Sequence, residues 1–300
     1  MQWLLVGVAL AAAIGLSLNA MALRIIRPPK RAIPRTAADL PFAFDDVSFE
    51  SDGRTLRGWL IYPNEPSGCG VAVVAHGWAS NSGEVLPIAE PVAASGHTAF
   101  VFDFRRHGRS DDAPHVTISD YRDDLTEAIR FVRERFPEKR LVVVGHSMGG
   151  AASILAVAAG APVDGIAIVA SPADLVEMTV EYLNEGWWPG AFLGPLIVPI
   201  LWMKAGGNRD ELVPERRMAA VTVPCIVIHP EHDKRVPLLH ARRLADLAGC
   251  ELRIIPDAGH VDILRHPGLH EAVVEFLDKC ADFESPTSQA PPESETSPRW

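Results

Sequence analysis

The stretch from Leu141 to Gly150, LVVVGHSMGG, constrains the fold more than any other part of the chain. An apolar run rich in valine stops at Gly145, and a small-residue segment, AASILAVAA, follows Gly150. This order predicts a buried strand, a sharp turn at Ser147 and a helix, the arrangement that exposes one serine at the end of a sheet strand. Gly145 and Gly149 stand two residues either side of Ser147, where a Cβ would clash as strand and helix cross. We expect a strained backbone at Ser147 and a helix start whose free N–H groups point at any negative charge forming beside it.

The length and charge of the chain limit what it can be. Three hundred residues suffice for one large α/β domain with a real core. The 28 basic and 38 acidic residues make the chain net acidic, which argues against nucleic-acid binding because that needs a basic face. The cysteines have no C-x-x-C spacing, so reduced thiols are expected rather than structural disulfides. They are Cys69, Cys225, Cys250 and Cys280.

The N-terminal run from Trp3 to Leu23 contains no charged residue and is about as long as a membrane-spanning helix. A cluster of basic residues follows it directly and is expected to stay in the cytoplasm. The sequence therefore predicts a single-pass signal anchor with a cytoplasmic catalytic domain. A cleaved signal peptide, leaving a secreted or periplasmic protein, is the alternative, because Asn-Ala-Met-Ala at 19–22 offers a small-x-small site. The basic residues are Arg24, Arg27, Lys30, Arg31 and Arg35.

Beyond the anchor, residues 24–44 are rich in Pro and Arg and are expected to form a juxtamembrane linker. Ser-Asp-Gly-Arg between residues 47–50 and 56–62 predicts a β-hairpin. Apolar runs then alternate with amphipathic segments, which predicts an α/β fold, a mostly parallel sheet with helices on both faces, over residues 45–283. The tail from Glu284 lacks apolar periodicity and is expected to be disordered. Strands are expected at 70–75, 98–102, 141–144, 165–170, 225–229 and 251–255, and helices at 84–95, 117–136, 237–249 and 267–280.

Two further residues follow predicted strands in an informative order. A serine hydroxyl is a poor nucleophile near neutral pH, so it needs a base, and the base needs a carboxylate to orient it. Asp233 follows the strand at 225–229, and His260 follows the strand at 251–255. Because parallel strands end at one edge of a sheet, both are expected near Ser147. The order serine, acid, histidine is that of α/β-hydrolases.

From about Val47 to Cys280 the chain resembles serine α/β-hydrolases, close to the esterase, monoacylglycerol-lipase and S33-type aminopeptidase branches. The resemblance lies in five motifs that occur in the family's order. They are His76-Gly77, Asp103 with His107-Gly108-Arg109-Ser110, Gly145-His-Ser-Met-Gly149, Asp233-x-x-Val-Pro and Gly259-His260.

The resemblance implies a role for each matching residue. Ser147 is the nucleophile, His260 the general acid–base and Asp233 the orienting acid. The oxyanion donors are the backbone N–H groups of Trp78 and Met148. The chain departs from the family at one turn, with Arg105-Arg106-His107-Gly108 where Arg-Gly-His-Gly is usual, which puts the local turn geometry in question.

Each of these residues has an alternative reading. Ser147 as an ordinary helix cap is disfavoured by the flanking glycines, and Asp174 or Asp262 stand as alternatives to Asp233. His76 and His146 are interpreted as structural. No metal-ligand spacing or glycine-rich phosphate loop is present, so neither a metal nor an organic cofactor is expected. The other histidines that compete with His260 are His107, His229 and His232.

The insertion at 172–222, between two core strands, has an unusually apolar middle. We interpret it as a small cap whose Trp187, Trp188 and Phe192 line an acyl-binding pocket. A second membrane contact near the anchor is the alternative.

The function predicted is a membrane-anchored serine hydrolase that cleaves a small, lipid-like carboxylic ester through an acyl-enzyme. An amide or thioester substrate, or another acyl acceptor, would use the same residues. A membrane-tethered binding protein with a disabled hydrolase fold is the alternative from a different class. The sequence leaves the acyl length, the leaving group and the oligomeric state open.

Overall fold

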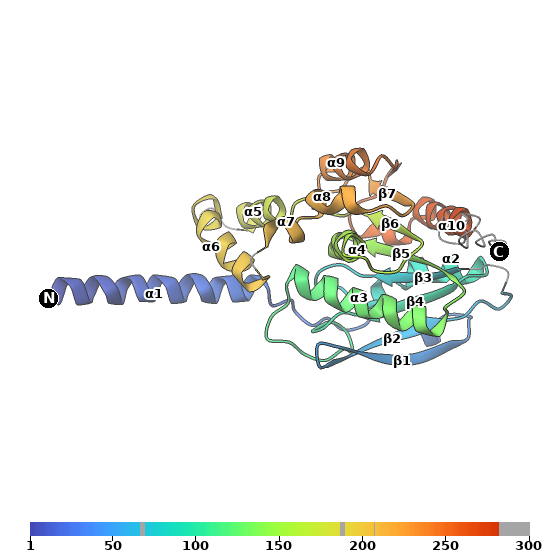
Figure 1. The fold of residues 1–300 in the computed structure, drawn as a ribbon, viewed down its shortest axis with the longest axis horizontal. Coiled ribbons are helices and arrows are strands. Elements are labelled where there is room, and N and C mark those ends of the chain that lie inside the picture. The colour runs from blue at the N-terminus through green and yellow to red at the C-terminus, as the bar shows by residue number, and fades with distance from the viewer. Residues whose placement is uncertain (67–69, 187–189, 207, 282–300) are drawn as a thin grey trace, which may run out of the picture.

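Eight strands form one sheet in the order β1-β2-β4-β3-β5-β6-β7-β8 (Figure 1). The computed structural model describes residues 1–66, 70–186, 190–206 and 208–281. β2 pairs antiparallel with β1 and β4, and the remaining neighbours pair in parallel, which confirms the predicted α/β-hydrolase fold. The tail expected to be disordered lies outside the described residues. The strands are β1 Phe44–Ser51, β2 Arg54–Ile61, β3 Gly70–Ala75, β4 Thr98–Asp103, β5 Arg140–His146, β6 Gly165–Val169, β7 Cys225–Pro230 and β8 Glu251–Ile255.

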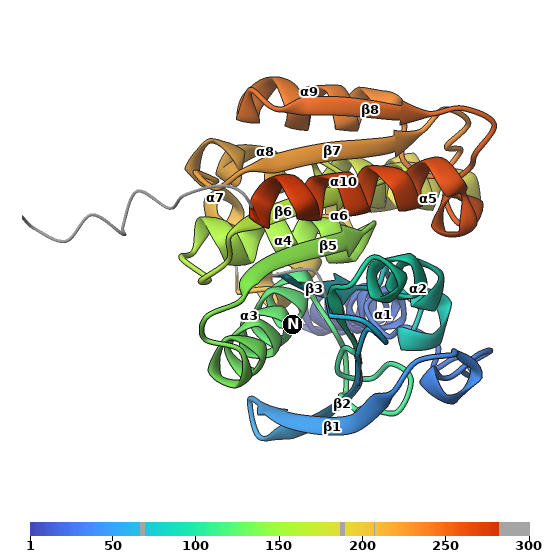
Figure 2. The same cartoon turned by 90° about the vertical axis from the view of Figure 1, so that its right-hand side faces the viewer.

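Helices cover both faces of the sheet, as Figure 2 shows. α2 (Leu86–Ala94) and α10 (Pro267–Ala281) pack on one face, and α3 (Ile118–Arg135), α4 (Met148–Ala158) and α9 (Leu238–Ala248) pack on the other. Alternate residues of the central strands supply the two cores, because successive side chains of a strand point to opposite faces. In β3, for example, Val71 and Val73 face α3 and α4, whereas Ala72 and Val74 face α2 and α10.

Helix α1 (Gln2–Ile25) projects from the domain as a separate rod (Figure 1). It is the one helix within the described residues that is long and apolar enough to cross a membrane, and a signal sequence would pass the same test. Its C-terminal end contacts α6 (Gly190–Lys204), and Ala22 is fully buried there. α1 therefore leaves the domain beside the helices inserted between β6 and β7.

The segment between α1 and β1, expected as a linker, is fastened along the domain. The Val116 N–H donates to the Ile26 carbonyl at 2.7 Å, and the Lys30 ammonium donates to the Ser110 carbonyl at 2.8 Å. The Asn81 amide donates to the Ala32 carbonyl at 3.2 Å. These partners are distant in sequence, so no local pattern predicts them. The linker thus ties α1 to the loops that follow β3 and β4.

Arg106, which occupies the glycine position of the family turn, adopts a left-handed conformation with φ of 63°. Its N–H donates to the Asp111 carbonyl at 2.8 Å, and its guanidinium donates to the Pro28 carbonyl at 3.1 Å. The same guanidinium pairs with Asp112. The turn therefore forms with arginine in place of glycine, because bonds to both the loop and the linker offset the steric cost of a side chain at positive φ.

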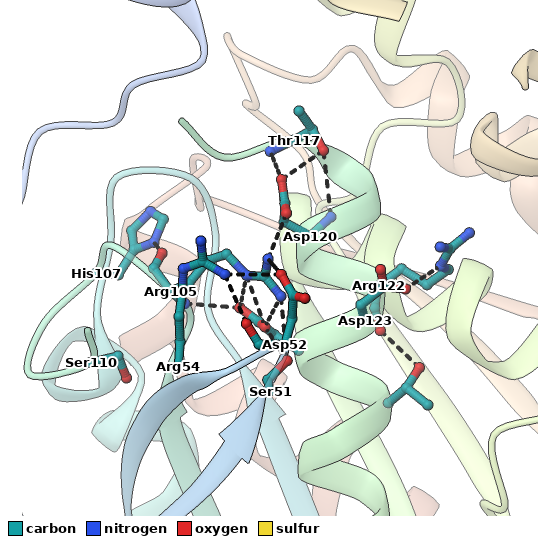
Figure 3. A network of polar contacts seen from close by, with 12 residues as sticks. Ser51, Asp52, Arg54, Arg105, His107, Ser110, Thr117, Asp120, Arg122 and Asp123 are labelled. Carbon is teal, nitrogen blue, oxygen red and sulfur yellow. Dashed lines mark hydrogen bonds and ion pairs between the residues drawn. The ribbon is translucent and has the colours of Figure 1, made fainter. Parts of the chain in front are cut away.

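Arg105 joins the turn after β4, helix α3 and the end of β1 in a buried ion-pair network (Figure 3). Its guanidinium lies 2.6 Å from the fully buried Asp124 carboxylate and 2.7 Å from Asp120, both on α3. It also donates to the Ser51 hydroxyl at 3.3 Å, at the end of β1. The pKa of Arg105 is raised: burial alone would lower it, but the hydrogen bonds and charges of the carboxylates outweigh that effect. The network fixes the N-terminal half of α3 against the turn after β4.

We expect Arg105→Met to destabilise the fold by about 3–5 kcal/mol, because it leaves the buried Asp124 carboxylate without its partner. Adding Asp124→Leu should recover more than half of that loss. Urea unfolding of the full chain in detergent micelles measures both. The control Arg54→Met removes an exposed pair with Asp52 and should cost less than about 1 kcal/mol. An Arg105→Met loss no larger than the control's would contradict a buried, coupled network.

Candidate active site

The turn between β5 and α4 holds Ser147 in a strained conformation, with φ of 55° and ψ of −118°. A Cβ on Gly145 would collide with Ser153 and with the Gly149 carbonyl, and a Cβ on Gly149 would collide with the Ala75 carbonyl. These contacts confirm the predicted need for glycine where strand and helix cross. The result is a serine whose side chain stands clear of its own helix at the carboxyl edge of the sheet.

Three side chains that are far apart in sequence meet at this edge. The His260 Nε2 atom lies 3.0 Å from the Ser147 Oγ, and the His260 Nδ1 atom lies 2.8 Å from the Asp233 carboxylate. His260 follows β8 and Asp233 follows β7, the two strands that succeed β6 in the sheet. Since the carboxylate accepts the Nδ1 proton, the Nε2 lone pair faces the serine hydroxyl. The hydroxyl proton therefore has an acceptor within hydrogen-bond distance.

Asp233 is held on both carboxylate oxygens. Oδ2 accepts from His260, and Oδ1 accepts the N–H groups of Arg235 and Val236, each at 2.8 Å. Burial opposes ionisation of Asp233, but the His260 hydrogen bond and charge and the two N–H groups outweigh it and lower the carboxyl pKa. Asp233 thus supplies a fixed negative charge behind the imidazole.

The alternative acids are engaged elsewhere. Asp174 caps the start of α5 (Leu175–Gly186), accepting the Val176 N–H at 2.6 Å. Asp262 accepts the N–H of Gly259, the residue before His260, at 2.9 Å. The structure therefore brings Asp233, and neither alternative, to the Nδ1 side of His260.

His146 contributes to the site through the backbone. Its Nε2 atom lies 2.8 Å from the His260 carbonyl oxygen, and the two rings lie 5.0 Å apart. Burial, followed by the nearby His260, lowers the pKa of His146 to about 3, so the ring is neutral and donates its Nε2 proton. This bond fixes the loop that carries His260, consistent with the structural role predicted for His146.

Two backbone N–H groups stand beside the serine. Met148 is the first residue of α4, so its N–H has no intrahelical acceptor. Trp78 lies in the loop after β3, and its N–H donates to no acceptor within the described parts of the chain. Gly77 approaches so closely that a Cβ there would lie 3.0 Å from the Cβ of Ser147. The loop and the helix start thus flank Ser147 with unused donors.

Tyr121, on the buried face of α3, is a residue near the site that was not predicted from the sequence. The Tyr121 hydroxyl lies 3.2 Å from the Gly77 carbonyl oxygen and 3.1 Å from the His107 Nε2 atom. A usable signal was present, because a tyrosine at a core position needs a partner for its hydroxyl. No sequence pattern indicates which group that partner is.

The cap differs from its expected form. Trp187 and Trp188, predicted to line an acyl pocket, lie outside the described residues. Phe192 lies on α6 with 80% of its surface exposed, so this helix turns it away from the domain. Ile197, also on α6, is instead fully buried. The apolar residues of α6 therefore divide between an inner and an outer side.

Titratable side chains do not cluster elsewhere in a way that suggests a metal. Across residues 1–66, 70–186, 190–206 and 208–281, no group of three or more His, Cys, Asp or Glu side chains could hold an ion. His232, one of the competing histidines, is exposed, and His229 is buried with its Nε2 atom 3.0 Å from the Val236 carbonyl oxygen.

Comparison with known proteins identifies the family. The model of a family described as serine aminopeptidase, S33, matches residues 66–204. The protein YfhR of Escherichia coli (strain K12), described as uncharacterized, is 30% identical over 250 residues, covering 79% of this chain and 81% of YfhR. The chain belongs to the S33 family of α/β-hydrolases.

Other similar proteins include named hydrolases. The monoacylglycerol lipase of Mycolicibacterium smegmatis is 26% identical over 265 residues, covering 75% of this chain and 89% of the lipase. The solved structure of the Pyrococcus furiosus esterase Pf2001 superposes with a TM-score of 0.69 at 22% identity, covering 85% of this chain and 99% of the esterase. The esterase likeness shows the shared fold.

We expect stability to fall as the pH drops from about 7 to about 5. Burial lowers the pKa of His76 to about 4 and that of His107 and His146 to about 3, against an ordinary value of 6.5. As the pH falls below the ordinary value, the unfolded chain takes up a proton at each of these residues and the folded chain does not, so each adds a slope that approaches about 1.4 kcal/mol per pH unit near pH 5. The urea midpoint of the full chain in detergent micelles, read from pH 7.5 to 5, measures the loss.

Two variants distinguish protonation of the buried histidines from other effects of acid on stability. His107→Gln should reduce the slope by one proton, whereas His232→Gln, at an exposed position, should leave it unchanged. A midpoint that stays constant down to pH 5 would show that these histidines do not remain neutral in the folded protein.

Proposed function

We propose that the protein is a serine hydrolase that cleaves a carboxylic ester with an apolar acyl chain through an acyl-enzyme intermediate. The observation that carries this proposal is the continuous hydrogen-bonded chain from Ser147 Oγ through His260 to Asp233. The strained serine, the paired imidazole and the two unused N–H groups are the parts that acyl transfer requires.

The reaction follows from this geometry. Ser147 Oγ attacks the ester carbonyl while His260 Nε2 accepts its proton, and Asp233 stabilises the imidazolium that forms. The carbonyl oxygen becomes an oxyanion and accepts hydrogen bonds from the Trp78 and Met148 N–H groups. The C–O bond to the alcohol then breaks, and His260 returns the proton to the departing oxygen. Water repeats the cycle on the acyl-enzyme, releasing the acid and restoring Ser147.

Two observations, the named relatives and the exposed side of α6, support a lipid-like substrate. A monoacylglycerol lipase and esterases are among the proteins similar to this chain. The outer side of α6 is apolar, with Phe192, Leu196 and Met203 exposed by 80%, 52% and 70%. This helix contacts the end of α1 (Figure 1). Apolar surface of the cap inserted between β6 and β7 is therefore exposed beside the end of α1.

We also propose that α1 is a retained single-pass anchor. Ala22, the last residue of the small-x-small site at 19–22, lies within α1 and is fully buried. Arg24, Arg27 and Arg31 follow the apolar run and form no ion pair within the described residues. Unpaired basic residues at this position favour a cytoplasmic domain, since such clusters resist translocation.

A fluorophosphonate probe should label the wild-type protein and fail to label Ser147→Ala. The same substitution should lower kcat/KM for p-nitrophenyl esters by at least about 10³-fold, because the nucleophile is removed. Within an ester series, activity should rise from acetate to medium-length acyl chains. Ser95→Ala, at the end of α2, is the control and should keep both labelling and activity.

Each result that departs from this pattern has a defined meaning. A wild-type protein that the probe does not label would refute the enzyme and leave a tethered binding protein. Labelling without hydrolysis of any ester would refute the ester substrate and favour an amide, a thioester or another acyl acceptor.

A compartment-sensitive reporter fused to the C-terminus should give a cytoplasmic signal, and an N-terminal epitope should remain on the mature chain in the membrane fraction. Both follow from an uncleaved α1 with basic residues on its cytoplasmic side. An extracytoplasmic reporter signal would reverse the proposed orientation. Loss of the epitope with release of the domain would instead establish a cleaved signal peptide.

A further inference from the structure

We infer that the Tyr121 hydroxyl is a positioning group for the oxyanion hole: it holds the Gly77–Trp78 peptide so that the Trp78 N–H points at the reacting centre. This role rests on the serine-hydrolase chemistry proposed above. It belongs to a residue of α3, outside the chain of Ser147, His260 and Asp233.

The first support is the way the Gly77 carbonyl is held. Its oxygen accepts from the His76 Nδ1 atom at 2.8 Å, from the Tyr121 hydroxyl at 3.2 Å and from the Ser80 N–H at 3.3 Å. The carbonyl of Gly77 and the N–H of Trp78 belong to one planar peptide, in which they point in opposite directions. Fixing the carbonyl on the α3 side therefore fixes the direction of the Trp78 N–H, which has no protein acceptor of its own in the described chain.

The next peptide, between Trp78 and Ala79, is held by His107, which Tyr121 also contacts. The Ala79 N–H donates to the His107 Nε2 atom at 3.3 Å, and the Tyr121 hydroxyl lies 3.1 Å from that nitrogen. Ala79 has a φ of 52°, a left-handed conformation that costs an alanine about 1–2 kcal/mol. Without these contacts, relaxation of Ala79 to an ordinary backbone conformation would lower the free energy of the loop. The Tyr121 hydroxyl thus contacts two acceptors that keep the loop in this shape, the Gly77 carbonyl oxygen and the His107 Nε2 atom.

The protonation states of the cluster are fixed by its hydrogen bonds. The His76 Nε2 atom accepts the Phe104 N–H at 3.2 Å, so the ring carries its proton on Nδ1 and donates to Gly77. The His107 Nδ1 atom donates to the Arg105 carbonyl at 2.9 Å, which leaves Nε2 as an acceptor. Burial keeps both rings neutral and raises the pKa of Tyr121 well above 10, so the hydroxyl remains a donor at every working pH.

Tyr121 is itself held in place by the Arg105 network of Figure 3. Asp120 and Asp124, one residue before and three after Tyr121 on α3, both pair with the Arg105 guanidinium. The Arg105 carbonyl in turn accepts the His107 proton. The Tyr121 ring stacks on Phe104, with centroids 4.1 Å apart. The hydroxyl is therefore presented by a rigid helix start rather than by a loop.

A positioned donor matters most when the charge it serves exists only in the transition state. The substrate carbonyl is a weak acceptor, so misalignment of the Trp78 N–H costs little in the ground state. The oxyanion is a strong acceptor, so the same misalignment raises the barrier. Both acylation and deacylation pass through this oxyanion. Loss of the Tyr121 hydroxyl should thus lower kcat whichever step limits the rate.

The test compares Tyr121→Phe with the wild-type full chain in detergent micelles. We expect kcat for a p-nitrophenyl ester to fall about 10- to 30-fold, less than the 10²–10³ for losing an oxyanion donor outright, with KM changed less than about 2-fold. Affinity for a boronic acid, which forms a tetrahedral adduct on Ser147, should fall by the same factor as kcat. Tyr62→Phe removes a hydroxyl bonded to Asp45 at the far end of β2 and should retain wild-type values.

The outcomes separate this role from the proposed function. A labelled, active wild type with a Tyr121→Phe kcat within about 2-fold overturns the positioning role alone, as does a lower kcat with unchanged boronic acid affinity. An unlabelled wild type overturns the hydrolase itself. If Tyr121→Phe does not fold, His107→Gln, which keeps an acceptor for the Ala79 N–H, should retain at least several-fold more kcat than His107→Leu. Equal kcat in that pair would overturn the role.

Discussion

The site depends on the backbone of Ser147 being held at a positive φ against its steric preference. Such a conformation costs on the order of 1–3 kcal/mol and persists only where the surroundings impose it. Here the Ser147 N–H donates to the Val169 carbonyl at the end of β6, at 2.8 Å, and its carbonyl accepts the N–H groups of Gly150 and Ala151. Gly145 and Gly149 let the strand and helix approach closely enough for those bonds. The order of the central strands therefore stabilises the serine conformation, and substitutions at either glycine act on Ser147 through the sheet.

The polar groups beneath the site are of two kinds with different tasks. Arg105 and its carboxylates are charged, and they fasten α3 to the turn after β4. The groups that contact the loop after β3, which carries Trp78, are neutral; they are His76, His107 and Tyr121. Neutral hydrogen bonds in a buried site orient peptide dipoles without adding a net charge that would compete with the oxyanion. Asp233 supplies a negative charge, behind the imidazole where an imidazolium would form. Of these groups, Asp233 is therefore the one that places a net charge next to the His260 imidazole.

Features set by neighbours within a few residues were predictable from the sequence. The hairpin of β1 and β2 and the turn at Ser147 are of this kind. The meeting of Ser147, Asp233 and His260 followed from one rule, that parallel strands end at a common edge. Three features were beyond reach. The bond between Ile26 and Val116 joins segments that share no pattern. Tyr121 has the spacing of a core residue. Phe192 lies in a helix that is apolar on every side, so periodicity does not indicate which side faces out.

The fastened linker connects the proposed anchor to the proposed chemistry. Lys30 and Ala32 are bonded to the loops after β4 and β3, and the second of these loops carries Trp78. The direction in which α1 leaves the domain is thus coupled to the position of the Trp78 loop, the proposed source of an oxyanion donor. α6, with its exposed apolar side, lies beside the end of α1 on the same end of the domain (Figure 1). If α1 is embedded, that side of α6 is brought to the bilayer, and an ester dissolved there meets apolar surface before it meets Ser147. The proposed preference for an apolar acyl chain would then arise from how the domain is mounted on the bilayer.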